Sequence, residues 1–337
     1  MLKSSFSRAL AVVVVTMLFL TSCDSGQLLD LALNPPGRKS IGGLNVGVNN
    51  FFVHREFGSI NQQYNEIHSV LGRSQVRVLL AWTNDVQPNP NVEPNIGFFD
   101  SVLTSIPAGV EVVVVLAHTP NWMLDPSNWV DGNPRKTWVE RWLRPVAARY
   151  GRLSRVVGFE IWNEPNLTVV ASDTALDLEN ADNYFEMLQL GSSAVRSAAP
   201  GKLVVIAATK SIQQDFPNSL NYNKRLRDLG AENLVDVWNV HYYGSSFESV
   251  VTSNGVADFL NTIRLPIWVT ESGEQGPNKQ LAYVETAWPF LKEKIPSIDR
   301  FYYYQYASTE PVDSNYGLKT TDPSFPVSDL YIFFSDS

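Results

Sequence analysis

Hydrophobic positions along the chain alternate between short, nearly continuous apolar runs and longer segments in which apolar residues recur at helical spacing. The runs are rich in β-branched residues, a pattern that is typical of parallel strands covered on both faces. Three of the segments between them, residues 59–71, 137–150 and 183–199, predict helices. Eight strands are predicted, and they begin near Leu44, Gln75, Val110, Val156, Leu203, Val235, Pro266 and Asp299.

This alternation of strand and helix predicts an α/β fold, the (β/α)8 or TIM barrel. Residues 44–337 form the predicted domain, and about 294 residues lie within the usual range for one such barrel. The length therefore predicts a single domain, and no sequence repeat accompanies the alternation of strands and helices.

The N-terminal residues predict that the protein is exported, and they are not part of the predicted barrel. Lys3 and Arg8 precede an apolar run at residues 9–20, in which Thr16 is the one polar residue, and this is the pattern of a signal peptide over residues 1–22. The Leu-Thr-Ser-Cys sequence that ends at Cys23 resembles a bacterial lipobox, which implies that this only cysteine is lipidated. The alternative is a buried free thiol behind an ordinary signal peptide. Residues 23–43, with their proline and glycine pairs, predict a tether.

Net charge and hydropathy limit the classes of partner that we expect for this chain. The formal net charge is −8, and removal of Lys3 and Arg8 with the signal peptide makes it −10, which argues against nucleic acid. No second apolar run reaches the ~20 residues that span a bilayer, so we expect membrane attachment through lipid alone. The expected location is the bacterial cell envelope, outside the cytoplasm, either periplasmic or at the cell surface. We expect a monomer.

Two glutamates stand at the ends of predicted strands. The stretch at residues 158–166 reads GFEIWNEPN, and Pro165 ends its strand because proline cannot donate a ladder hydrogen bond, which leaves Glu164 at the tip. Residues 265–273, LPIWVTESG, end in the same way at Glu271. Catalytic groups of a (β/α)8 barrel gather at the carboxyl ends of its strands. Two carboxylates placed there are the pair that retaining glycoside hydrolysis requires.

With these motifs the chain resembles the glycoside hydrolases of the (β/α)8 clan A, the cellulase and β-xylosidase-like superfamily. That pattern has an Arg on strand two, a His after strand three, Asn-Glu on strand four, His-x-Tyr on strand six, Glu on strand seven and an aromatic residue on strand eight. The Thr-Pro-Asn-Trp turn after strand three and the WNEPN stretch are closer to β-xylosidase-type members than to cellulases. The matching residues are Arg77, His118, Asn163, Glu164, His241, Tyr243 and Glu271, with Tyr304 where the family usually has Trp.

The resemblance implies hydrolysis of β-O-glycosidic bonds in an oligo- or polysaccharide by a retaining double displacement. Glu164 would be the acid/base and Glu271 the nucleophile. Arg77 and Tyr243 would lower the pKa of Glu271 by charge and hydrogen bonding. Asn163 would bind the sugar 2-hydroxyl, an interaction that strengthens in the transition state.

The remaining candidates are the supporting histidines and the tryptophans. His118 and His241 would bind hydroxyls or orient the carboxylates. The long loop at residues 119–136 carries Trp122 and Trp129, and long loops in a compact domain are usually functional. Their indole rings, with that of Trp82, suit sugar rings, and plain packing is the alternative.

Two other functions compete with this one. A metal-dependent hydrolase would need more ligands, because the chain has four His, no His-x-His on strand one and no HExxH. We therefore expect neither metal nor cofactor. A catalytically silent carbohydrate-binding lipoprotein on the same barrel is the second alternative, and the presence of both glutamates argues against it.

Overall fold

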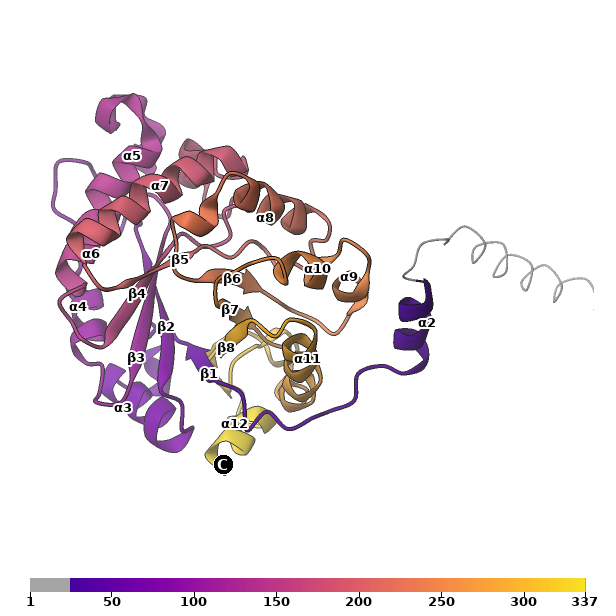
Figure 1. Cartoon of the computed structure of the whole chain (residues 1–337). Helices are drawn as coiled ribbons and strands as arrows, with labels where there is room; N and C mark the ends of the chain where they lie inside the picture. Colours follow the sequence, from indigo (N-terminus) through magenta and orange to yellow (C-terminus); the bar gives the residue numbers. More distant parts are fainter. Residues whose placement is uncertain (1–24, 337) are drawn as a thin grey trace, which may run out of the picture.

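The computed structural model describes residues 25–336 (Figure 1). The predicted signal peptide and Cys23 lie outside the described residues, so export and lipidation stay predictions. Within residues 25–336, none of the helices combines the length and the apolar character that crossing a bilayer requires.

Eight parallel strands form the predicted barrel. Their order is β5-β4-β3-β2-β1-β8-β7-β6, and the bridge between Val205 and Val237 closes the ring between β5 and β6. Each predicted strand is found within a few residues of its expected start, which confirms the (β/α)8 fold. The strands are β1 (Val46–Asn49), β2 (Gln75–Ala81), β3 (Glu111–Ala117), β4 (Val156–Ile161), β5 (Leu203–Ile206), β6 (Trp238–His241), β7 (Ile267–Ser272) and β8 (Ile298–Tyr303).

Helices surround this barrel, and the three predicted from periodicity are among them (Figure 1). The first begins at Ser59, whose side chain caps it together with Gln62 in a reciprocal capping box. The helices are α3 (Ile60–Asn65) with the π-helical turn η2 (Glu66–Val70), α4 (Gly97–Thr104), α5 (Pro134–Trp138) with the π-helical turn η6 (Val139–Leu143) and α6 (Arg144–Tyr150), α7 (Ala181–Ala198), α8 (Asn218–Asp228), α9 (Glu248–Val251), α10 (Val256–Leu260), α11 (Gln280–Lys294) and α12 (Asp329–Ser335).

The core consists of two apolar clusters, because side chains alternate between the two faces of each strand. Val112 and Val114 of β3 belong to the large apolar layer between barrel and helices, whereas Val113 belongs to a separate small cluster. Because successive side chains of a strand point to opposite faces, this second cluster lies inside the barrel. Trp268 of β7 and Tyr302 of β8 are its largest members. The barrel is therefore filled with side chains near one end, and polar residues occupy the other end.

The segment before the barrel contains a helix that its turn-rich composition does not predict. Helix α2 (Ser25–Leu33) lies outside the ring of helices, and an extended stretch leads from it past α11 to β1 (Figure 1). Arg38 forms an ion pair with Glu285 of α11, and Lys39 forms one with Glu293. These contacts hold the predicted tether against the barrel.

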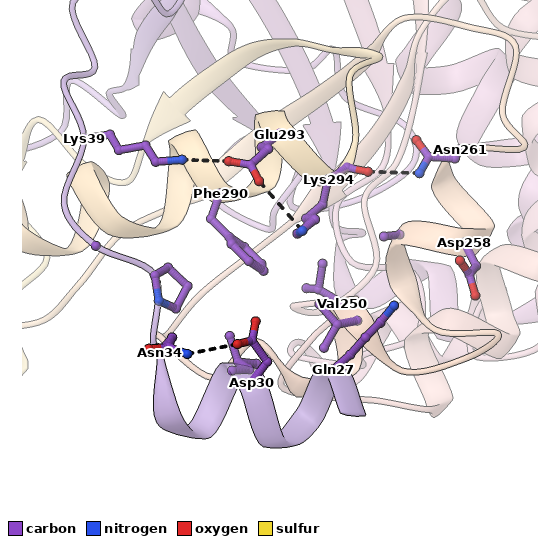
Figure 2. Close-up of a pocket in the computed structure, with 15 residues that line it drawn as sticks. Gln27, Asp30, Asn34, Lys39, Val250, Asp258, Asn261, Phe290, Glu293 and Lys294 are labelled. Atoms are coloured by element: carbon purple, nitrogen blue, oxygen red, sulfur yellow. Dashed lines mark hydrogen bonds and ion pairs between the residues drawn. The ribbon is translucent and has the colours of Figure 1, made fainter. Parts of the chain in front are cut away.

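A cavity of about 460 Å³ is lined by residues of α2, α9, α10 and α11. Figure 2 shows the ring of Phe290 pointing into this space from α11, with Asp30 of α2 on the opposite side. The same view shows Lys39 meeting Glu293 at the edge of the cavity.

Candidate active site

Arg77 of β2 is the centre of a buried network at the carboxyl ends of the strands. The side chain is 1% exposed, and its Nε and Nη2 donate to Glu160 at 2.7 and 2.9 Å. Its Nη1 donates to Glu271 at 2.6 Å and to Asn49 at 3.0 Å, and Nη2 also donates to Asn163 at 2.7 Å. All five N–H groups of the guanidinium are thus used, which satisfies the requirement that a buried charge be paired and hydrogen-bonded.

Two carboxylates neutralise this cation. Burial alone would lower the pKa of Arg77, but the charges of Glu160 and Glu271 outweigh it and the pKa is raised. Arg77 is therefore a permanent positive charge inside the barrel. The prediction that it lies beside Glu271 agrees with the structure.

Glu160 is the site residue that the sequence reasoning missed. It is fully buried, and Asn239 of β6 donates a hydrogen bond of 2.9 Å to it in addition to those from Arg77. Its neighbours Phe159 and Ile161 belong to the outer apolar layer, so Glu160 points into the barrel. In the sequence, Glu160 stands out as one acidic residue inside an otherwise apolar strand, and such a residue indicates a buried cationic partner.

Glu271 precedes the last residue of β7 and is 9% exposed. One carboxylate oxygen accepts from Arg77, and the other accepts from the hydroxyl of Tyr243 at 2.8 Å. Burial raises the pKa of Glu271, but electrostatic interactions with His241 and Arg77 and the hydrogen bonds from Tyr243 and Arg77 outweigh it, so the net pKa is lowered. The arrangement favours an ionised carboxylate with a fixed orientation.

Tyr243 keeps its proton under these conditions. Burial first, and then the charge of Glu271, raise the pKa of its phenol well above the ordinary value. The hydroxyl is therefore a hydrogen-bond donor to Glu271 throughout the neutral range.

Glu164 lies in the turn that follows β4, three residues beyond the last strand residue Ile161. Its carboxylate is 2.9 Å from Nδ1 of His241, which is fully buried at the end of β6. One oxygen of Glu164, one oxygen of Glu271 and a ring nitrogen of His241 all lie within 4.8 Å of one another. Strands that are distant in sequence thus bring both predicted carboxylates to one point.

The backbone that carries Glu164 adopts unusual conformations. Trp162 has φ 79° and Glu164 has φ 46°, in the left-handed region that residues other than glycine rarely adopt. Such a residue costs roughly 1–3 kcal/mol, and such residues cluster at functional sites. The Glu164 N–H donates to Ala208 after β5 at 2.9 Å, which fixes this turn of the chain.

His118 lies at the end of β3 and is bound to a loop. Its Nδ1 is 2.9 Å from Asp173, which also accepts a hydrogen bond from Thr119 at 3.0 Å. Among residues 25–336 its hydrogen-bonding partner is Asp173 rather than Glu164 or Glu271. The role of His118 towards substrate stays a prediction.

Tyr304 follows β8 and is half-buried. Its ring centroid lies 6.1 Å from that of Tyr243 in an edge-on arrangement. The structure therefore brings the predicted strand-eight aromatic residue next to the partner of Glu271.

The predicted sugar contacts of two tryptophans, Trp82 and Trp122, need a correction. Trp82 is fully buried, stacks on Trp142 at 5.8 Å and meets Trp122 edge-on at 5.2 Å. Its faces are covered by protein, so the predicted contact of Trp82 with sugar is wrong and packing is its role. Trp122 is 9% exposed and donates to the Gln87 carbonyl at 3.1 Å, so it is mainly a packing residue too.

Trp129 differs from these two tryptophans because it is only half-buried. Its indole N–H donates to the carbonyl of Met123 at 2.7 Å, which orients the ring within the loop. Its predicted contact with a sugar ring stays a prediction.

Glu164, His241 and Glu271 together form the described group that best resembles a metal-ligand set. The Glu271 carboxylate, however, already accepts from a guanidinium and a phenol. A divalent cation there would be repelled by the positive charge of Arg77. The donor set thus suits a pair of reacting carboxylates better than a metal ion.

Solved structures with a similar fold include glycoside hydrolases. A family 39 glycoside hydrolase from Bacteroides cellulosilyticus WH2 is 17% identical, with 87% of this chain and 62% of that chain covered and a TM-score of 0.57. An exo-β-1,4-mannosidase from Opitutaceae bacterium strain TAV5 is 16% identical, with 89% and 60% covered and a TM-score of 0.62. A monomeric β-xylosidase from Caulobacter crescentus CB15 is 16% identical, with 89% and 69% covered and a TM-score of 0.59.

The chain spans about three fifths of the length of the first two of these structures. At such identities the likeness shows the barrel fold. Among curated proteins, none has a sequence that matches this chain. The family described as Cellulase (glycosyl hydrolase family 5) matches residues 41–304, which include both glutamates and every strand of the barrel. This chain therefore belongs to glycosyl hydrolase family 5.

Proposed function

We propose that this protein hydrolyses β-O-glycosidic bonds of an oligo- or polysaccharide with retention of anomeric configuration. The observation that carries the proposal is the approach of a Glu164 oxygen to within 4.8 Å of a Glu271 oxygen. Carboxyl groups are ~5–5.5 Å apart in retaining enzymes and ~6.5–9.5 Å apart in inverting ones, which need room for a water molecule.

In the first step Glu271 is the nucleophile. Its ionised oxygen forms a bond to the anomeric carbon while the bond from that carbon to the glycosidic oxygen breaks. Glu164 gives its proton to the departing oxygen. Arg77 and Tyr243 orient Glu271 and support its ionised state, because each donates to one of its oxygens.

In the second step Glu164 is the general base. It takes a proton from water, the water oxygen bonds to the anomeric carbon, and the ester bond to Glu271 breaks. His241 holds Glu164 through the 2.9 Å contact and thereby keeps the carboxylate on the reacting side. Two displacements at one carbon restore the original configuration.

Asn163 is oriented for its predicted contact with the sugar 2-hydroxyl. Its side-chain oxygen accepts from Arg77 at 2.7 Å, so the amide group is fixed with its NH₂ group directed away from the guanidinium. This NH₂ group is a donor that suits the 2-hydroxyl of the sugar under attack. Hydrogen bonds at this hydroxyl strengthen as the oxocarbenium-like transition state develops.

Turnover of a panel of aryl β-glycosides tests the proposal, with product configuration followed by NMR. We expect release of the β-anomer before mutarotation. Release of the α-anomer would overturn the retaining mechanism. Binding of oligosaccharide without turnover of any aryl or polymeric substrate would instead favour a silent carbohydrate-binding protein.

We also propose that the mature chain begins at a lipidated Cys23 and is anchored outside the cytoplasm. The motif at residues 20–23 and the apolar run before it support this. A single acyl chain binds membranes only marginally, so two or three chains are expected. Metabolic labelling with palmitate should be lost in Cys23→Ser, and labelling that persists would contradict the proposal.

A further inference from the structure

The polar side of α2 faces the barrel. Gln27 and Asp30 of α2 and Asn34, the residue after it, are spaced by three and four residues and so lie on one side of the helix. All three line the cavity that α9, α10 and α11 also line, and Figure 2 shows them on the side of α2 that borders this space. Among the described residues of α2, Leu31 alone packs against the core of the barrel. This orientation is the reverse of that in an ordinary surface helix, whose apolar side faces the core.

The apolar side of α2 faces away from the barrel. Leu29 and Leu33 lie one turn apart and are 50% and 70% exposed. Leu33 is the most exposed large hydrophobic residue in the described part of the chain, and Ala32 beside it is exposed too. A continuous apolar surface in contact with water is typical of a site that binds a protein or a membrane.

The sequence before α2 indicates which of these covers the apolar side. Cys23, whose lipidation is proposed above, stands two residues before Ser25, where α2 begins. Two residues span at most about 7 Å, so acyl chains on Cys23 would bring a bilayer to within that distance of the first turn. The nine residues of α2 extend for about 13 Å. The whole helix is therefore within reach of the lipid to which the chain would be attached.

Charge does not supply the attraction in this contact. The chain is acidic, with a formal net charge of −8, and an anionic bilayer repels it. Arg38 and Lys39, the cations that follow α2, are already paired with Glu285 and Glu293. Binding of α2 to a bilayer must therefore come from burial of its leucines, which does not depend on the charge of the lipid.

We propose that α2 is a membrane-contacting helix, which lies on the bilayer surface with Leu29 and Leu33 among the acyl chains and its polar side towards the barrel. The inference rests on the proposed lipidation of Cys23 and adds a second, non-covalent contact to it. A lipidated chain without this contact could turn freely on its anchor. With it, the barrel is held to the bilayer by the flank that α9, α10 and α11 form.

The contact is tested on the lipidated protein, purified in detergent and returned to vesicles of phosphatidylethanolamine and phosphatidylglycerol. Cys23 is the only cysteine and its thiol is blocked by lipid, so an introduced cysteine alone takes the fluorophore NBD. Leu33→Cys places the label on the apolar side of α2, and Asn34→Cys places it on the cavity side. Spin-labelled lipid should quench the label at position 33 about three-fold or more strongly than the label at position 34, because an interfacial helix buries one face.

Ile332→Cys is a second control, because Ile332 is apolar and 51% exposed but belongs to α12. Its label should be quenched as weakly as the label at position 34. Equal quenching at positions 33 and 34, or none at position 33, would overturn the inference. Protection of the label at position 33 from iodide without quenching by lipid would mean that a second copy of the chain covers the leucines, which also overturns it. A thermal melt shows whether each variant is folded.

The apolar basis of the contact is tested by the lipid composition. Replacement of phosphatidylglycerol by phosphatidylcholine should leave the quenching at position 33 within about two-fold, because no lipid charge is needed. Loss of quenching in the uncharged vesicles would overturn this basis. Failure of the proposed lipidation gives a different result. Cys23 of the unsubstituted protein would then take NBD, and the chain would stay in solution when the vesicles are sedimented, which would contradict the anchor and the inference together.

Discussion

The barrel mouth and the cavity beneath α2 both contain ion pairs, but the two regions differ in what surrounds the charges. At the mouth the side chains of Arg77 and Glu160 are 1% and 0% exposed. Beneath α2 the side chains of Lys39 and Glu293 are 59% and 54% exposed. The space under α2, about 460 Å³, is open to solvent and its lining includes none of the residues of the buried network at the mouth. Size alone does not mark the place where chemistry occurs.

The difference in exposure determines how strongly each ion pair contributes to stability and to the orientation of its side chains. Exposed ion pairs contribute ~0–1 kcal/mol because water screens both charges. A buried charge must be fully paired, and removal of one partner typically costs ~3–5 kcal/mol. The buried network therefore holds Glu271 in one position and one protonation state, whereas the pairs near α2 only help to seat a segment on the surface.

The largest effect is expected from the two glutamates. Glu271→Ala should abolish ordinary turnover, with a loss greater than the ~10²–10⁴ that a general acid supplies, because no covalent intermediate can form. Glu164→Ala should retain glycosylation by activated aryl substrates and accumulate the intermediate. Azide should then give a β-glycosyl azide with Glu164→Ala and an α-glycosyl azide with Glu271→Ala. Identical azide products from the two variants would contradict the assigned roles.

Next in size is the loss of the buried cation. Arg77→Met leaves Glu160 buried without its ion-pair partner and should lower the free energy of unfolding by ~3–5 kcal/mol. Urea denaturation followed by tryptophan fluorescence measures it. Lys39→Met is the control beneath α2 and should cost less than about 1 kcal/mol. Similar losses of unfolding free energy in both variants would show that burial does not make the ion pair at the mouth stronger than the one at the surface.

A smaller effect concerns pH. The pKa of Glu271 is lowered, so its ionised form is present above that pKa and is lost as pH falls through it. Tyr243→Phe removes one of the hydrogen bonds that lower this pKa. We expect the acid limb of the kcat/KM profile to move to higher pH, with the basic limb unchanged. Phe51→Leu, which changes a ring outside contact with Glu271, is the control; an unmoved acid limb in Tyr243→Phe would contradict this account.

The smallest effect should follow from breaking the salt bridges of the N-terminal segment. Arg38→Gln removes its pair with Glu285, which is 56% exposed on the arginine side. The expected change in the free energy of unfolding is within about 1 kcal/mol, and the change in kcat/KM is within experimental error. A strong loss of activity would show that the N-terminal segment and the barrel mouth are energetically coupled.

The sequence predicts much of this fold because parallel strands leave a strong signal. Continuous apolar runs set the eight strands, and Glu164 and Glu271 stand where those runs end. Arg77 was recognisable for the same reason, since a charge inside an apolar strand needs a buried partner. Glu160 carries the same signal on β4, four residues before Glu164.

The tryptophans and α2 were less predictable, for a physical reason. A tryptophan in a loop can face solvent or pack beneath it, and the choice for Trp82 depends on Trp122 and Trp142, which come from other parts of the chain. For α2, the proline and glycine pairs after Leu33 suggest a tether throughout, whereas the contact of α2 with α9 and the ion pair of the following Arg38 with Glu285 of α11 are tertiary effects. Neither outcome is encoded in local spacing.

The five hydrogen bonds of Arg77 have a consequence for the order in which the protein is assembled. Its partner Glu160 lies 83 residues further along the chain, but Glu271 lies 194 residues away. Contacts of such sequence separation form late, because the chain must first lose the entropy of closing the intervening loop. During synthesis Arg77 can pair with Glu160 while β7 is still to be made. Glu271 then arrives at a guanidinium that is already in place, so the network at the mouth is complete only after β7 has been added.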